Sequence, residues 1–91
     1  MTIDDRPPVG PTARRDVTLQ RVGREAILHD ARNGQAHVIN GSAAQLWELC
    51  DGRPLDDLVA AFAALYGREP QTVAEDVRRT LARFEALGLL S

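Results

Sequence analysis

Few residues of this 91-residue chain could take part in catalysis, and one of them is its single cysteine, Cys50. A cysteine acts as a nucleophile only where positive charge or a neighbouring base stabilises its thiolate. The spacing of Cys50 with Leu46 and Trp47 instead places all three on one stripe of a helix. Free cysteines on such stripes are buried and unreactive. We therefore predict that Cys50 and Trp47 belong to the core.

The two histidines, His29 and His37, are the remaining candidates for metal binding. We expect them to face each other across a pair of strands. Zinc sites use three or four ligands, and no further Cys, His or carboxylate stands at a suitable spacing. Asp30 follows His29 directly, so its side chain should point to the opposite face of the sheet. The sequence therefore predicts no metal site and no cofactor.

Catalytic motifs are absent from the sequence: there is no GxSxG, HExxH or CxxC motif and no phosphate-binding glycine loop. No nucleophile can be paired with a base. We therefore do not expect an enzyme.

Arg79 and Arg83 lie four residues apart on one face of a predicted helix. Glu75 and Asp76 stand at the spacings that allow ion pairs with Arg79. Arg83 has no acidic residue at these spacings, so it is the more available of the two. Two interpretations stay open: a solvated helix face, or contact with an anionic partner.

Charge and composition limit the possible partners and location. The net charge is -2 and the pI is near 5.6, which is not the basic footprint of a nucleic-acid-binding protein. A single cysteine and the lack of a secretory segment favour a cytoplasmic protein. No stretch approaches the roughly 20 apolar residues that a membrane span needs.

Residues 1–16 contain three prolines and no apolar run, so we expect a disordered N-terminal arm. Residues 17–91 then form one domain. Its first half predicts strands at 17–22, 25–30 and 36–40, joined by short turns into an antiparallel meander. The third strand would lie at an edge with free backbone groups.

The turn at residues 31–35 predicts a register for this hairpin. If Ala31 pairs with Gln35, Gly34 occupies the left-handed position of a three-residue loop. This register places Leu28 opposite Val38.

The second half predicts three helices. Ser42 with Gln45, and Thr72 with Glu75, fit capping boxes at the starts of the first and third helices. The second helix should cover residues 54–67, with Leu65 and Tyr66 among its buried residues. Strands followed by helices give an α+β fold.

The runs AHVINGSAAQLWELCDG, LDDLVAAFAALYG and EDVRRTLARFEALGLL make the chain resemble the PqqD family. These are small peptide chaperones named for pyrroloquinoline quinone biosynthesis. The family is similar to the recognition elements that bind precursor peptides of ribosomally made, post-translationally modified natural products. The resemblance runs from about Val17 to Leu90. It implies a three-stranded sheet followed by a winged helix-turn-helix-like set of helices.

The resemblance also implies a function and a site. The leader segment of a precursor peptide would add as a strand to the third strand and lie against the third helix. The domain would present it to a maturation enzyme, such as a radical SAM protein or a peptidase. The peptide-binding residues would be Gln35, Ala36, His37, Val38 and Ile39 from the strand, with Asp76, Arg79, Thr80 and Arg83 from the helix.

A second hypothesis is a winged-helix DNA-binding regulator, because three helices of this kind also occur in such proteins. The negative net charge and the acidic residues on the third helix count against it. Strong, salt-dependent binding to random DNA would favour it.

Overall fold

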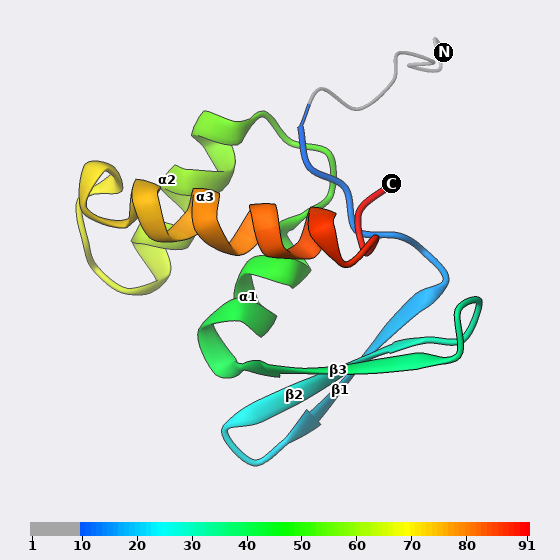
Figure 1. Cartoon of the computed structure of the whole chain (residues 1–91). Helices are drawn as coiled ribbons and strands as arrows, with labels where there is room; N and C mark the ends of the chain where they lie inside the picture. The colour runs from blue at the N-terminus through cyan, green and yellow to red at the C-terminus, as the bar shows by residue number, and fades with distance from the viewer. Residues whose placement is uncertain (1–9) are drawn as a thin grey trace, which may run out of the picture.

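The computed structural model of the protein describes residues 10–91 and contains three strands followed by three helices (Figure 1). The strands are β1 (Val17–Val22), β2 (Glu25–Asp30) and β3 (Gln35–Asn40). The helices are α1 (Gly41–Leu49), α2 (Leu55–Leu65) and α3 (Pro70–Ala86). The predicted α+β class and the order of its elements are confirmed.

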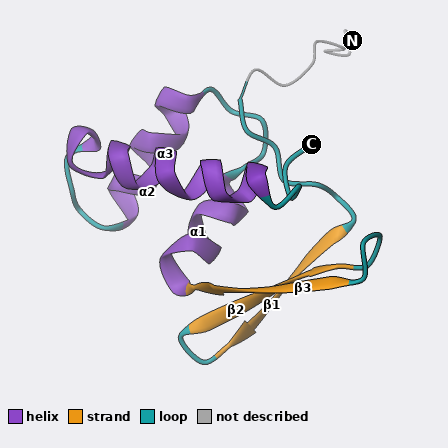
Figure 2. Ribbon diagram, viewed as in Figure 1, coloured by secondary structure: helices purple, strands orange, loops and turns teal. Residues whose placement is uncertain are grey.

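The sheet is antiparallel in the order β1-β2-β3, and the three helices lie on one side of it (Figure 2). Alternation along each strand sends Leu28 and Ile39 towards the helices, where both are buried. Val38 points to the other side and is 57% exposed. One face of the sheet therefore belongs to the core, and the other is open among the described residues.

The β2–β3 hairpin differs from the prediction by one residue. Asp30 pairs with Gln35, and the loop covers the four residues 31–34. Gly34 does adopt the left-handed conformation, with φ of 64°. The loop is longer because the Asp30 carboxylate accepts hydrogen bonds from the Asn33 backbone N–H (3.4 Å) and side-chain amide (2.7 Å). That local turn keeps Asp30 as the last residue of the strand.

The shifted register changes the cross-strand pairs. His37 lies opposite Leu28 and His29 lies opposite Ala36, so the predicted pairing of the two histidines is wrong. The register is held by burial: it places Ile39 opposite Ala26 on the helix-facing side, and both are buried. A shift of one residue would turn Ile39 out into solvent.

Both predicted capping boxes are also wrong. Asn40 caps α1, and its Oδ1 atom accepts hydrogen bonds from the Ala43 N–H (2.8 Å) and the Ser42 hydroxyl (2.9 Å). The strand therefore passes into the helix without a linking residue. At α3, Pro70 takes the first helical turn, where its fixed φ fits and its missing N–H costs nothing, so the helix starts before Thr72.

The core joins the helices to the sheet through aromatic and aliphatic side chains. The rings of Trp47 and Phe84 meet edge to face, with centroids 5.4 Å apart. Cys50 is 4% exposed, and burial raises the pKa of its thiol to about 11. The prediction of a core Trp47 and Cys50 is confirmed. The prediction for the last turn of α2 is wrong, since Leu65 and Tyr66 are 55% and 42% exposed.

Residues 10–16 are ordered and packed, so the predicted disordered arm is wrong for this part. Residues 10–14 lie between the segments that follow α1 and α3, with isolated bridges from Thr12 to Asp51 and from Ala13 to Leu90. Arg14 is buried and pairs with Asp30. The sequence did not indicate this packing, because a segment rich in proline and charged residues shows no strand periodicity. The rest of the predicted arm lies outside the described residues.

Among residues 10–91, no helix is both long enough and apolar enough to cross a membrane.

Candidate functional site

The outer edge of β3 is the first part of the candidate site. β3 is the last strand of the sheet, and no described strand pairs with its outer side. β3 contacts β2 and α1, whereas α3 contacts mainly α2. An edge strand of this kind offers a row of unpaired N–H and C=O groups.

The register tells which residues of β3 offer these groups. The β1–β2 turn has two residues with Gly23 at φ of 62°, and such a hairpin closes on a hydrogen-bonded pair, here Val22 with Glu25. Bonded and non-bonded pairs alternate from that point along β2. We therefore expect His37 and Ile39 to bond to β2. The backbone groups of Ala36 and Val38 then face the free side.

The helix-facing side chains of β3 form one wall beside this edge. Ile39 is buried, and His37 is half-buried. The His37 Nε2 atom is buried and has no hydrogen-bond partner within the described residues. The wall therefore combines an apolar surface with an unpaired polar atom.

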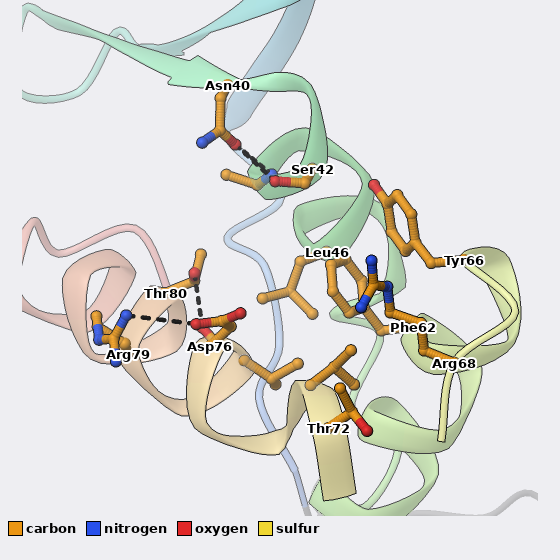
Figure 3. Close-up of a pocket in the computed structure, with 13 residues that line it drawn as sticks. Asn40, Ser42, Leu46, Phe62, Tyr66, Arg68, Thr72, Asp76, Arg79 and Thr80 are labelled. Carbon is orange, nitrogen blue, oxygen red and sulfur yellow. Dashed lines mark hydrogen bonds and ion pairs between the residues drawn. The ribbon is translucent and has the colours of Figure 1, made fainter. Parts of the chain in front are cut away.

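A cavity of about 510 Å³ opens where β3 passes into α1 (Figure 3). Apolar side chains from all three helices, including Leu46, Phe62 and Val77, line it, and polar groups stand around them. The polar residues are Asn40, Ser42, Tyr66, Arg68, Thr72, Asp76, Arg79 and Thr80. A cavity that combines apolar side chains with a polar rim can accept a ligand side chain and offer it polar contacts at the rim.

Polar contacts on α3 fix part of this rim. The Thr80 hydroxyl donates a hydrogen bond to the Asp76 carbonyl (2.8 Å). Arg79 forms exposed ion pairs with Asp76 (3.3 Å) and Glu75 (3.8 Å), as the sequence predicted. Arg83 lies in the last turn of α3 and has no ion-pair partner among residues 10–91. Of the two arginines, Arg83 is therefore the one without an acidic partner in the described part of the chain, and so the more available to an anionic group.

The structure groups the predicted site residues into two sets. Residues 35–39 form the strand edge, while Asp76, Arg79 and Thr80 lie together on the cavity rim. Arg83 stands one turn further along α3 and does not line the cavity. The role of all nine in binding stays a prediction.

Sequence reasoning missed cavity residues that come from the end of β3, from α1 and from α2, among them Asn40, Leu46 and Phe62. A signal was present for Asn40, because an asparagine between a strand and a helix is a natural N-cap. Leu46 and Phe62 looked like ordinary core residues, which they also are.

The arrangement offers groups that can bind a ligand. No cluster of three or more His, Cys, Asp or Glu residues that could hold a metal ion occurs in the described part of the chain. Cys50 is buried, and its raised pKa keeps it a neutral thiol. Within residues 10–91 the site offers a strand edge without a partner strand, a cavity with apolar and polar lining, and an arginine without an acidic partner, which together suit an extended peptide.

Comparisons with known proteins agree with this description. A solved structure described as "TbiB1 in Complex with the TbiA(beta) Leader Peptide" matches the fold with a TM-score of 0.72 and 22% sequence identity. The match covers 88% of this chain and 94% of that one. None of the curated proteins compared with the chain matches it. The family model described as "Coenzyme PQQ synthesis protein D (PqqD)" matches residues 25–90. Because this match covers well over half of the chain, the protein belongs to the PqqD family.

Proposed function

We propose that this protein is a non-catalytic peptide chaperone of the cytoplasm. It binds the leader segment of a ribosomally made precursor peptide as a strand added to β3. It then presents that peptide to a modifying enzyme. The observation that carries the proposal is the outer edge of β3, which pairs with no described strand and lies beside an open cavity.

Strand addition explains how such a protein can bind without a deep pocket. The main-chain groups of the ligand bond to the free groups of Ala36 and Val38, and these bonds depend little on sequence. Alternate side chains of the added strand point towards the helices. They meet His37 and Ile39 on one wall and α3 on the other, so the groove can select side chains while the edge supplies affinity.

The cavity and Arg83 give two separate elements of selectivity. The cavity accepts one large apolar or aromatic side chain at the α1 end of the added strand. Arg83, nearer the other end of α3, favours an acidic residue of the leader. Asp76, Arg79 and Thr80 line the rim between these two points and add polar contacts.

Family membership and the solved neighbour support this function. The family is described by its part in the synthesis of coenzyme PQQ. The neighbour is a complex with a leader peptide. In this chain the same fold leaves the outer edge of β3 without a partner strand among residues 10–91. The proposed partner is a modifying enzyme, such as a radical SAM enzyme or a peptidase, which would act on the bound peptide.

The DNA-binding alternative gains no support from these features. Arg79 is already paired with acidic residues of its own helix, and α3 carries acidic residues along the same face. The phosphates of DNA would therefore be repelled by these carboxylates as well as attracted by the arginines.

A peptide-selection experiment tests the proposal. The full chain is immobilised and used to enrich peptides from a display library, together with leaders from short reading frames beside its gene. Each binding peptide is then resynthesised with single N-methyl groups. Strand addition predicts that N-methylation at alternate positions abolishes binding and that the intervening positions tolerate it. Uniform tolerance, or failure to enrich any peptide, contradicts the proposal.

A further inference from the structure

Arg14 forms the most buried charge network of the described residues. Its side chain is 8% exposed, and that of its partner Asp30 is 0% exposed. Two guanidinium nitrogens donate to the two oxygens of Asp30, at 2.9 and 3.1 Å. The remaining contacts of Asp30 come from Asn33. A buried carboxylate held in this two-pronged way is fully satisfied and geometrically fixed.

The same side chain also reaches the end of α3. The Arg14 Nη1 atom that donates to Asp30 donates to the Gly88 carbonyl as well, at 2.9 Å. The backbone reinforces this contact, because the Arg14 N–H donates to the Leu89 carbonyl at 3.1 Å. One arginine therefore joins the end of β2 to the chain that leaves α3.

These contacts stand at one end of the proposed peptide groove. Asp30 is the strand partner of Gln35, the first residue of β3, and Gly88 follows α3 by two residues. Figure 1 shows the N-terminal segment passing beside the C-terminal end of the chain, above the sheet. At the opposite end of the groove, α1 continues directly from β3 and packs on α2. The two ends of the groove are thus fastened by different parts of the protein.

We infer that Arg14 is a positioning residue for peptide binding: its bridge to Asp30 and Gly88, here called the Arg14 bridge, sets the separation of β3 and α3 at the Gln35 end. The inference rests on the proposed function. The matched family region covers residues 25–90, so Arg14 itself lies outside it, while its partners Asp30 and Gly88 lie within it. Arg14 acts through the two walls of the groove and need not touch the peptide.

The chemistry of the bridge requires arginine. Nε and Nη2 of the guanidinium donate to Asp16 at 3.0 and 2.9 Å, Nη2 and Nη1 donate to Asp30, and Nη1 also donates to the Gly88 carbonyl. A planar fork with five donors can serve three acceptor groups at once. A lysine keeps the positive charge at a single nitrogen and cannot hold the same three groups in one plane.

Two variants and one control test the bridge in the full chain. Arg14→Lys keeps the charge and loses the geometry. The double variant Arg14→Met with Asp30→Leu replaces the buried pair by apolar groups, a change that proteins often tolerate without loss of stability. Arg53→Met is the matched control, because Arg53 also pairs two-pronged with an aspartate two residues away, Asp51, but in an exposed loop.

Peptide affinity is measured with the tightest-binding peptide from the display selection, at a temperature well below the thermal unfolding midpoint of each variant. Both bridge variants should bind about tenfold more weakly, while the control binds normally. Chemical-shift changes on binding should shrink at Gln35 and stay unchanged at Asn40. Because every variant is folded under these conditions, a purely structural role for Arg14 would leave the affinity unchanged, and that result overturns the inference.

A second measurement needs no peptide. A nitroxide is attached to a cysteine introduced at the exposed Ala86, with the buried Cys50 left unlabelled. The nitroxide broadens the NMR signals of the Gln35 and Ala36 amides. The extent of this broadening should change in the bridge variants and not in the control. Unchanged broadening overturns the inference. If the wild-type protein binds no peptide while the broadening does change, the proposed function fails and the bridge stands.

Discussion

His37 and Leu28 face each other across β3 and β2, on the helix-covered side of the sheet. The neighbours of His37 therefore present their side chains to the open face. By the alternation of bonded pairs, Ala36 and Val38 also turn their backbone groups to the free edge. This single pairing decides which residues of β3 can bind an added strand.

Val38→Pro should strongly weaken peptide binding while the fold survives. Proline removes the N–H that faces the free edge and leaves the ladder to β2 intact, and proline is tolerated on edge strands for this reason. We expect at least about a tenfold loss of affinity, from a missing hydrogen bond and the bulk of the ring. Calorimetric titration measures it. Val38→Thr keeps the N–H and should bind normally; equal binding by both variants would argue against strand addition.

Thr72→Phe should weaken peptide binding by filling the cavity at the α1 end of the groove. Thr72 is exposed and lines the cavity, whereas its neighbour Gln71 does not. Both substitutions lie on the surface of α3, so each should change the free energy of unfolding by no more than about 0.5 kcal/mol. A fluorescence-polarisation assay with a labelled peptide compares Thr72→Phe with Gln71→Phe. Equal affinities would show that no ligand side chain enters the cavity.

Arg83→Glu should reduce the affinity for a leader with an acidic residue more than Arg79→Glu does. Arg83 has no ion-pair partner among residues 10–91, while Arg79 already pairs with Glu75 and Asp76. An exposed pair contributes up to about 1 kcal/mol, so reversal of its sign corresponds to roughly a fivefold to tenfold loss. The loss should also diminish as salt is added. If Arg83→Glu binds the acidic leader with unchanged affinity, Arg83 is not part of the site.

Asp30 should make the stability of the protein sensitive to acid. Hydrogen bonds from Arg14, with a further one from Asn33, lower the pKa of Asp30 from 3.8 to about 2. A lowered pKa in the folded state means that the carboxylate stabilises the fold fully above pH 3.8. This stabilisation is lost as the pH falls towards 2.

Asp30→Asn tests this account through urea midpoints measured across that pH range. The variant should be less stable at neutral pH and should show a flatter decline in acid. Asp51→Asn is the control: Arg53 lowers the pKa of Asp51 to about 2 as well, but the pair is exposed and contributes less to stability. An undiminished acid slope in Asp30→Asn would mean that other carboxylates cause the decline.

Much of the fold follows from local patterns in the sequence. The alternation of apolar and polar residues predicts β1, and the apolar stripe predicts α3. The glycine after α3, Gly88, ends that helix with φ of 71°. Leu46, Trp47 and Cys50 share a stripe, so their burial was predictable. The open edge of β3 followed from short connections between three strands.

The failures over the hairpin register, the N-terminal segment and the cavity share a physical cause, which is dependence on distant residues. The register of β2 and β3 is held by the burial of Ile39 and by the Asp30 turn, and the Asp30 carboxylate is in turn held by Arg14. Contacts between residues sixteen positions apart leave no trace in local spacing. The cavity likewise needs three helices to converge, so its apolar residues could be recognised only as core.

The exchange rates of the β3 amides give the most direct test of the central claim. An isotope-labelled sample of the full chain is measured by NMR alone and saturated with a selected peptide. The account predicts that the Ala36 and Val38 amides exchange fast in the free protein and become protected in the complex, while His37 and Ile39 are protected in both. If Ala36 and Val38 are already protected without peptide, or stay unprotected when peptide is bound, the leader does not add to β3 and the account is wrong.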